Sequence, residues 1–206
     1  MAGCGDRLGI EALFRDRLGT KLDLVVRRLV PADAAEYRAL RLRALREHPD
    51  AFTSDYAEEA RKPADALASR LSTAEHANER MFGAFVDGVL VGTVGLIREA
   101  RLKNRHKATL VGMYVTGEAA GRGTGRQLLD AALDDARRQG DITRVVLTVT
   151  QGNDAARELY ERAGFQTFGV EPCAIRVGDA WFAKEHMGLT LSGPEPSPAA
   201  ADPDRV

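Results

Sequence analysis

A glycine-rich turn between a predicted strand and a predicted helix constrains this chain more than any other feature. Residues 108–115 form an apolar run that predicts a strand, and three glycines follow it within residues 121–125. Residues 126–139 then predict a helix with leucines and alanines on one side, ended by Gly140. Glycines let the backbone approach a ligand, and the free amides of a first helical turn attract phosphate. The turn therefore favours a phosphate-binding loop over a plain strand-to-helix connection.

The rest of the sequence predicts further strands and helices around this unit. The Asp87-Gly88 pair suits a type I′ turn, which predicts a hairpin of residues 82–86 and 89–97. This order of elements predicts a mixed α/β fold with parallel and antiparallel pairs in one sheet. Other strands are expected at residues 22–29, 142–150, 165–170 and 181–191, with a loop or strand near 175–177, and helices at 31–48, 63–71 and 153–163.

The chain divides into one domain and two appendages. Its 206 residues are enough for a single domain. We expect residues 22–191 to form that domain, with residues 50–62 irregular. Residues 1–21 form a leader with one short helix near residues 10–18. Residues 192–206 hold four prolines and almost no large apolar side chain, so they predict a disordered tail.

Composition excludes several classes of function. Lys and Arg together number 29 and Asp and Glu 30, so the net charge of -1 gives no electrostatic case for nucleic acid or an anionic membrane as partner. No apolar run approaches the roughly 18 residues of a transmembrane helix, and the N-terminus lacks a signal-type apolar core. Cys4 and Cys173 have no metal-type neighbours, so we expect free thiols and no metal. A cytoplasmic protein is the expectation.

Three phosphate-loop chemistries compete for the glycine turn. An ATPase P-loop needs Lys and Ser or Thr after its last glycine, but Arg126-Gln127 follows Gly125 here. A dinucleotide site needs an acid at the end of the next strand, and residues 148–151 supply none. The pyrophosphate of coenzyme A remains as the third candidate, and a nucleotide-binding α/β protein remains a weaker alternative.

Two motifs resemble those of the GCN5-related N-acetyltransferases. The strand ending in Met113-Tyr114-Val115, the glycine turn and the following helix look like the family's motif A, with Ala120 at the position usually held by Arg or Gln. The segment from Asn153 to Phe165, with its Ala, Leu-Tyr and Gly-Phe pairs, resembles motif B. The resemblance spans roughly residues 22–191. It implies a mostly antiparallel central sheet flanked by helices, with a splayed strand pair that binds coenzyme A.

The resemblance implies acetyl-CoA as cofactor and acetyl transfer to a primary amine by direct attack in a ternary complex. The turn amides would hold the pyrophosphate, and the strand before it would pair with the pantetheine arm, with a bulge at Gly112. A homodimer is also implied, since dimers are common in the family. The cofactor-binding residues carried over are Met113, Tyr114, Val115, Gly121, Arg122, Gly123, Thr124, Gly125, Arg126, Asn153, Ala156 and Tyr160.

Catalysis of amine acetylation needs a base for the amine and benefits from an acid for the thiolate. Tyr160 matches the family's general acid, and it lies two helical turns after Asn153, a residue type that also caps helices. The strand at 108–115 carries no glutamate, so the candidate bases are Glu58, Glu59 and His186.

Acceptor specificity is expected from residues 50–62 and 171–179. Phe52, Tyr56, Glu58 and Glu59 could make a partly acidic pocket for a cation, walled by Pro172 and Trp181. The acceptor is a small-molecule amine or a peptide or protein amine. The functional alternative is a non-catalytic acyl-CoA-binding sensor or scaffold of the same fold.

Overall fold

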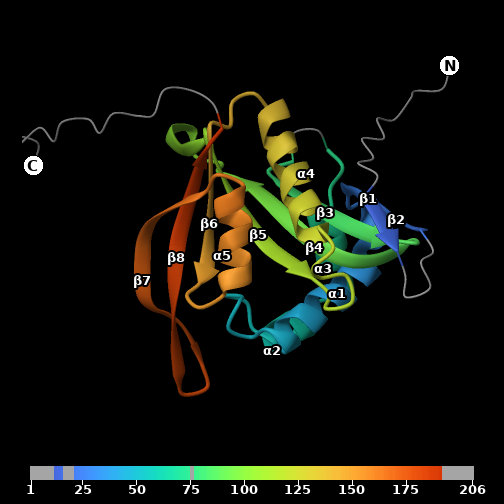
Figure 1. The fold of residues 1–206 in the computed structure, drawn as a ribbon, viewed down its shortest axis with the longest axis horizontal. Coiled ribbons are helices and arrows are strands. Elements are labelled where there is room, and N and C mark those ends of the chain that lie inside the picture. Colours follow the sequence, from blue (N-terminus) through green and yellow to red (C-terminus); the bar gives the residue numbers. More distant parts are fainter. Residues whose placement is uncertain (1–11, 16–20, 75–76, 192–206) are drawn as a thin grey trace, which may run out of the picture.

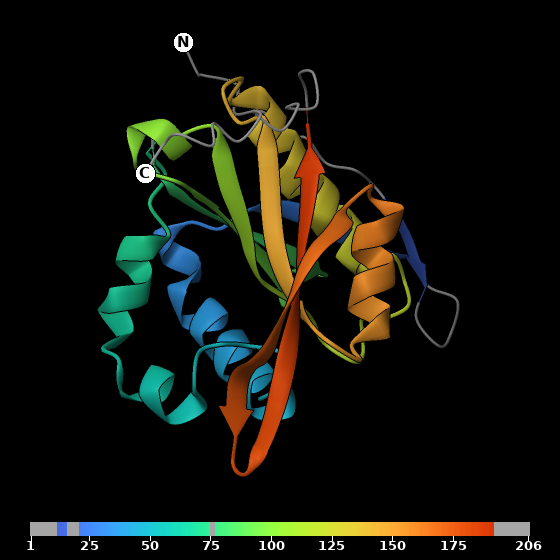
Figure 2. The same ribbon diagram turned by 90° about the vertical axis from the view of Figure 1, so that its left-hand side faces the viewer.

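The structure is a computed structural model that describes residues 12–15, 21–74 and 77–191, and within them one sheet carries helices on both faces (Figures 1 and 2). Eight described strands form this sheet in the order β1-β2-β3-β4-β5-β6-β8-β7, and only the β5–β6 pair is parallel. The sheet is therefore mixed and mostly antiparallel, as expected. The strands are β1 (Ala12–Arg15), β2 (Lys21–Arg28), β3 (Glu79–Val86), β4 (Val89–Arg98), β5 (Lys107–Val115), β6 (Arg144–Thr150), β7 (Gln166–Val177) and β8 (Ala180–Thr190).

Two helical layers cover the sheet. In Figure 2, the blue and teal helices α1 (Ala34–Glu47), α2 (Tyr56–Arg61) and α3 (Ala64–Arg70) lie on one side of the sheet. The yellow helix α4 (Thr124–Arg138) and the orange helix α5 (Asp154–Arg162) lie on the other side. Two single turns of 3-10 helix, η1 (Pro31–Asp33) and η2 (Leu102–Asn104), complete the elements.

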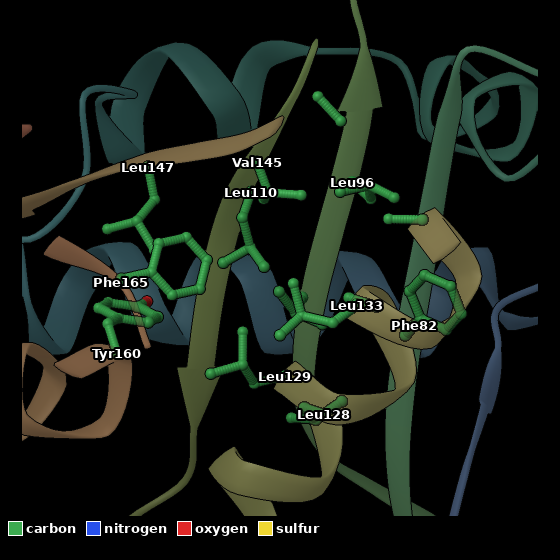
Figure 3. Packing of buried hydrophobic residues seen from close by; sticks show 14 of the residues in the cluster. Phe82, Leu96, Leu110, Leu128, Leu129, Leu133, Val145, Leu147, Tyr160 and Phe165 are labelled. Atoms are coloured by element: carbon green, nitrogen blue, oxygen red, sulfur yellow. The ribbon is translucent and has the colours of Figure 1, made fainter. Parts of the chain in front are cut away.

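Each face has its own apolar core, which explains why the sheet holds both layers. Leu128, Leu129 and Leu133 of α4 pack on central strands of the sheet, and Tyr160 of α5 packs beside Phe165 (Figure 3). The second core joins α1 and α3 to the opposite face and includes Tyr114 of β5. Burial on both faces makes the central strands β3 and β4 nearly continuous apolar runs.

The hairpin between β3 and β4 forms as its turn sequence predicts. Asp87 and Gly88 both have positive φ, at 48° and 81°, which is the conformation of a type I′ turn. The turn pairs Val86 with Val89 and Phe85 with Leu90, and a register shift between Ala84 and Phe85 then places Phe82 opposite Val94. Local turn chemistry thus sets the first pairs of the hairpin, and the irregularity sets the pairs beyond it.

A bulge at Gly112 reorganises β5. The β4–β5 register shifts between Thr93 and Gly95, and Gly112 takes a φ of 61°. Before the bulge, Ala108 and Leu110 pack toward α4 and α5. After it, Met113 and Val115 pack on that side. One extra residue therefore exchanges the two faces of the strand.

The parallel pair β5–β6 separates just before this bulge. In the described chain the two strands pair only from Lys107 to Thr109 on β5 and from Arg144 to Val146 on β6. Beyond these residues the strands run on without pairing, to Val115 and Thr150. The expected splayed strand pair is therefore present, and the edge of β5 that faces β6 is open.

Two local expectations were wrong, and a third, which allowed a loop or a strand near residues 175–177, is decided in favour of a strand. The short helix expected at residues 10–18 is replaced, in its described part, by strand β1, which pairs with β2. Residues 50–62 contain helix α2, whose start is capped by the Asp55 carboxylate; it accepts hydrogen bonds from the amides of Ala57 and Glu58 at 2.7 and 3.1 Å. Residues 166–177 form one long strand, because pairing with β8 resumes at Ile175 after a register shift. The expected tail at residues 192–206 and most of the leader lie outside the described residues.

Candidate active site

A cavity of 350 Å³ lies at the splay between β5 and β6. Its floor is the end of β6 and the bulged part of β5, including Gly112 and Met113. Helix α5 contributes one wall, and helices α1 and α2 with the loop between them contribute the opposite wall. The cavity therefore connects the two faces of the sheet. The residues on the α5 side are Asn153, Ala156 and Tyr160, and those on the α1–α2 side include Tyr37, Arg41, Phe52, Glu59 and Lys62.

The bulge aims backbone groups of β5 into the splay. The amide of Thr116 donates to the carbonyl of Val91 on β4 at 2.9 Å. Because successive peptide groups of a strand alternate in direction, Tyr114 also faces β4, whereas Met113 and Val115 face the open edge. These two residues can pair with an extended ligand arm as a further strand would. Met113 lines the cavity itself.

Tyr114 does not reach this site with its side chain. Its ring is 5% exposed and belongs to the core under α1 and α3. Its hydroxyl donates to Oε2 of Glu47 at 2.5 Å, and burial followed by the Glu47 contact raises the pKa of Tyr114. The side chain of Tyr114 therefore has a structural role and not the role in cofactor binding that was expected. The bulge is the reason, because without it Tyr114 would share the face of Ala108 and Leu110.

We predict that Tyr114→Phe leaves acetyl-CoA affinity unchanged within about twofold. The variant removes the hydroxyl that contacts Glu47 and retains the buried ring, so the melting temperature should fall by about 2 °C. Calorimetric titration and thermal unfolding measure the two effects. A loss of acetyl-CoA affinity without a loss of stability would show that the Tyr114 hydroxyl does take part in cofactor binding.

The glycine turn presents uncapped amides at the start of α4. Gly121 and Gly123 have φ values of 72° and 82°, and a Cβ on either would meet no atom within 4 Å. Gly123 is the N-cap of α4, and no side chain caps the helix there. The first amides of α4 therefore point to open space, where a helix N-terminus attracts a pyrophosphate. The site fits the expected cofactor.

The side chains around this turn have different tasks. Thr124 is buried, and its hydroxyl donates to the carbonyl of Ala119 at 3.0 Å, so it holds the turn in shape. Nε of Arg126 donates to Asp130 at 2.9 Å, and Arg122 is exposed. Gly125 lies against α5, with Leu159 Cδ2 at 3.4 Å from the position of a Cβ. The turn thus offers its backbone to a ligand, while Thr124 and Gly125 fix where the helix begins.

Helix α5 brings Asn153, Ala156 and Tyr160 to the cavity together. The Asn153 carboxamide oxygen accepts the amide of Ala156 at 3.2 Å, so Asn153 does cap this helix. Its side chain also lines the cavity, so capping and ligand binding are compatible. Their spacing of three and four residues puts all three side chains on one face of the helix.

Tyr160 is buried next to the splay. It is 5% exposed, and its ring makes an edge contact with Phe165, at 5.9 Å between centroids (Figure 3). Burial raises the pKa of the Tyr160 hydroxyl above its usual value. The hydroxyl therefore stays protonated at neutral pH and can donate to a sulfur that develops negative charge.

The three candidate bases occupy very different places. Glu59 is 3% exposed and lines the cavity; its Oε2 pairs with Lys62 Nζ at 2.7 Å, while its Oε1 is buried without a hydrogen-bond partner. Glu58 is exposed at the first turn of α2 and outside the cavity lining. His186 on β8 contacts Glu171 at 3.0 Å and is also outside it. The structure brings only Glu59 to the cavity.

Of the partly acidic acceptor pocket that was expected, Phe52 and Glu59 line the cavity, whereas Tyr56 and Glu58 do not. Four basic side chains line the cavity, against the single carboxylate of Glu59. Trp181, expected as a wall, is 59% exposed in the β7–β8 hairpin and stacks on Arg176 at 5.3 Å. The four basic residues are Arg41, Lys62, Arg70 and Lys184.

The sequence held a usable signal for one of these missed residues, Arg41. Arg41 follows Tyr37 by four positions and precedes Ala44 by three, so it lies on the buried stripe of α1. Lys184 lies three positions before buried Met187 on β8, and therefore on the opposite face of the sheet, and it is itself 5% exposed. Its ammonium donates to the Ala51 carbonyl at 2.9 Å and to Thr150 Oγ1 at 2.7 Å, which holds the loop at residues 51–54 on the sheet. For Arg41, the sequence signal is a charged residue on the apolar face of a predicted helix.

Comparison with known proteins identifies this arrangement. The family model described as "Acetyltransferase (GNAT) family" matches residues 42–165, which include β5, the glycine turn and α5. The chain is 28% identical over 198 residues to an L-methionine sulfoximine/L-methionine sulfone acetyltransferase of Pseudomonas aeruginosa, with 96% of each chain covered. These matches support N-acetyl transfer and not a non-catalytic sensor or scaffold.

Solved structures show the same fold. An acetyltransferase of the GNAT family from Streptococcus pneumoniae has a TM-score of 0.76 and 26% identity, covering 82% of this chain and all of its own. The structure of yncA from Salmonella typhimurium, with its cofactor acetyl-CoA, has a TM-score of 0.73 at 22% identity, covering 86% of this chain and 99% of its own. None of the helices in the described residues is long and apolar enough to cross a membrane.

Proposed function

The chain belongs to the acetyltransferase (GNAT) family and transfers an acetyl group from acetyl-CoA to an amine, and we propose that its acceptor is a small molecule bound in the cavity between β5, α1 and α2. The observation that carries this proposal is the cavity itself. Its 350 Å³ is near the lower end of ligand pockets, about 300–1,000 Å³, and must also admit the reacting end of the cofactor. That the Pseudomonas aeruginosa relative is named for acetylating methionine sulfoximine and sulfone supports a small acceptor.

We assign the cofactor to the side of the sheet that carries α4 and α5. The amides from Gly121 to Arg126 would hold the pyrophosphate, and the backbone of Met113 and Val115 would align the pantetheine arm along the open edge of β5. Ala120 stands where the family has Arg or Gln, and the backbone amides leave little for that side chain to add. When bound, acetyl-CoA supplies a thioester whose carbonyl carbon bonds to the amine and whose sulfur departs as a thiolate.

Two side chains on opposite walls would move the protons. Glu59, with one unpartnered carboxylate oxygen, would hold the amine and accept a proton from its nitrogen as the N–C bond forms. Tyr160 would donate its hydroxyl proton to the departing sulfur as the C–S bond breaks. The amide of Val115 would stabilise the carbonyl oxygen while it carries negative charge. The products are an N-acetylated amine and free coenzyme A.

A screen of acceptor amines tests this function. Purified full-length protein is given acetyl-CoA and free amino acids, methionine sulfone, polyamines, aminoglycosides or short peptides, and thiol release is recorded. We expect turnover with small amines and at least about 10-fold lower kcat/KM with peptides. Turnover with peptides alone would refute a small acceptor.

A cytoplasmic location and the formation of a homodimer stay predictions.

A matched pair of glycine variants tests the cofactor loop. Gly123 is the N-cap of α4, and Gly140 directly follows the C-cap, Gln139. Their φ values are 82° and 74°, and a Cβ on either would meet no atom within 4 Å. Alanine at either position should destabilise the fold by a similar amount, about 1–2 kcal/mol. Only Gly123→Ala should weaken acetyl-CoA binding, by about 10-fold or more, because it redirects the turn amides. Equal affinities of the two variants in calorimetry would place the pyrophosphate elsewhere.

A further inference from the structure

Arg41 is the one cation of the cavity that the described structure leaves without an anionic or carbonyl partner. Arg70 pairs with Glu79, Lys62 pairs with Glu59, and Lys184 donates to Ala51 and Thr150. Arg41 lines the cavity, and its Nη1 is buried without a hydrogen-bond partner. A buried guanidinium nitrogen without an acceptor is expensive, so the position calls for a ligand that supplies one.

The local packing holds this guanidinium in place. Arg41 lies over the ring of Phe52 with its central carbon 4.7 Å from the ring centroid. Desolvation by burial is the largest influence on the pKa of Arg41 and lowers it. A guanidinium fixed by stacking loses little further freedom when it binds a planar carboxylate with two parallel hydrogen bonds.

Glu59 supplies the opposite charge in the same cavity. The two side chains influence each other electrostatically, yet their ion pairs in the described residues do not include one another. Oε1 of Glu59 and Nη1 of Arg41 are both unpartnered. The cavity thus holds a carboxylate oxygen that can accept a hydrogen bond from an amine and a guanidinium nitrogen that can donate one to an acid group. Both would be used by a small molecule that carries an amine and a carboxylate.

We propose that Arg41 binds the carboxylate of an α-amino acid or a close analogue whose amine is held by Glu59. This inference rests on the proposed function and names the acceptor class and the residue that selects it. The further cations Arg70 and Lys184 add positive potential to the cavity, which favours an anionic acceptor over a polyamine or an aminoglycoside. The cavity size favours one amino acid over a peptide.

Matched acceptors separate carboxylate recognition from amine reactivity. For each of the proteinogenic amino acids, the free acid, its carboxamide and the amine that lacks the carboxyl group are compared as acceptors. The carboxamide has a less basic amine than the acid, so more of it is neutral and chemistry alone favours the carboxamide. We expect the wild-type protein to prefer the acid of its best triplet by about 10- to 100-fold in kcat/KM. No preference in any triplet would overturn the inference.

Arg41→Gln and Arg46→Gln form the matched pair of variants. Both arginines lie on α1 and both stack on an aromatic ring, Arg41 on Phe52 and Arg46 on Tyr56 at 5.0 Å, but only Arg41 lines the cavity. Arg41→Gln should reduce the preference for the acid to less than about threefold, mainly through KM, and Arg46→Gln should retain it. If Arg41→Gln keeps the preference, or if Arg46→Gln loses it equally, Arg41 does not read the carboxylate.

Acetyl-CoA affinity distinguishes failure of this inference from failure of the proposed function. A protein that binds acetyl-CoA and acetylates amines without regard to the carboxyl group contradicts the inference alone. A protein that acetylates no small amine contradicts the proposed function and the inference with it. Arg41→Gln should bind acetyl-CoA as the wild type does, and loss of this affinity together with stability would show that Arg41 is structural.

Discussion

Replacing Glu59 by glutamine should lower kcat/KM with the best acceptor by about 100-fold or more, the range in which a positioned general base acts. The substitution keeps the shape and one acceptor oxygen, but it removes the charge that holds an ammonium and the group that takes its proton. Glu59 is suited to this task because it is buried at the cavity, with one oxygen fixed by Lys62 at 2.7 Å and the other unpartnered. Steady-state kinetics over a range of pH measures the effect. The loss should shrink as pH rises, because bulk solvent then deprotonates more of the amine.

Glu58→Gln is the matched control for this variant. Glu58 is the neighbouring residue with the same side chain, but it is exposed at the start of α2 and does not line the cavity. We expect its kcat/KM to stay within about twofold of the wild type, as for most surface substitutions. Equal losses in both variants would indicate a general effect of α2 on the fold, and equal retention would exclude Glu59 as the base.

Tyr160→Phe should lower kcat by about 10- to 100-fold and change acetyl-CoA affinity by less than about threefold. The effect is smaller than for many general acids, because a thiol has a pKa near 8.5 and departs tolerably as a thiolate. Burial raises the pKa of Tyr160 and makes its hydroxyl a weak acid, so the proton moves to the sulfur only once negative charge has developed there. Its main contribution is a hydrogen bond to the sulfur that strengthens as charge develops there.

Tyr114→Phe provides the comparison for this second variant. Both tyrosines are 5% exposed, and both lose only a hydroxyl, but Tyr160 lines the cavity while Tyr114 contacts Glu47 on the opposite face. Turnover measured at saturating acetyl-CoA should fall in Tyr160→Phe alone. An unchanged kcat in Tyr160→Phe would mean that water protonates the thiolate, and the acid role would be lost.

The backbone geometry of the proposed cofactor side was predictable because it depends on local interactions. Gly123 has a positive φ where the glycine turn ends and α4 begins. Asn153 caps α5 because its side-chain oxygen accepts a hydrogen bond from the amide of Ala156, three residues later. Such requirements are met within a few neighbouring residues, so they leave a mark on the sequence. The bulge at Gly112 was foreseeable in the same way, from a glycine in the middle of a strand.

The orientation of Tyr114 was not predictable from that same glycine. A bulge shifts every later side chain by one face, and only the register between β4 and β5 shows where the shift takes place. The backbone prediction for Met113 and Val115 agrees with the register, while the side chain of Tyr114 turned out to belong to the core under α1. A sequence motif predicts where the strand lies, but it does not predict which side chains point to which face of the sheet.

By itself, the sequence determined the family, the mixed α/β fold and the turn that fits a pyrophosphate, since these depend on contiguous motifs and short-range backbone conformation. Only the tertiary structure decided which residues form the proposed acceptor side. Packing across the sheet brings Arg41 of α1, Glu59 of α2 and Lys184 of β8 to one cavity, although they lie up to 143 positions apart in the sequence. Their burial and the absence of partners at Arg41 Nη1 and Glu59 Oε1 arise from that packing. Charge recognition at long sequence separation therefore had to be observed, because no local pattern carries it.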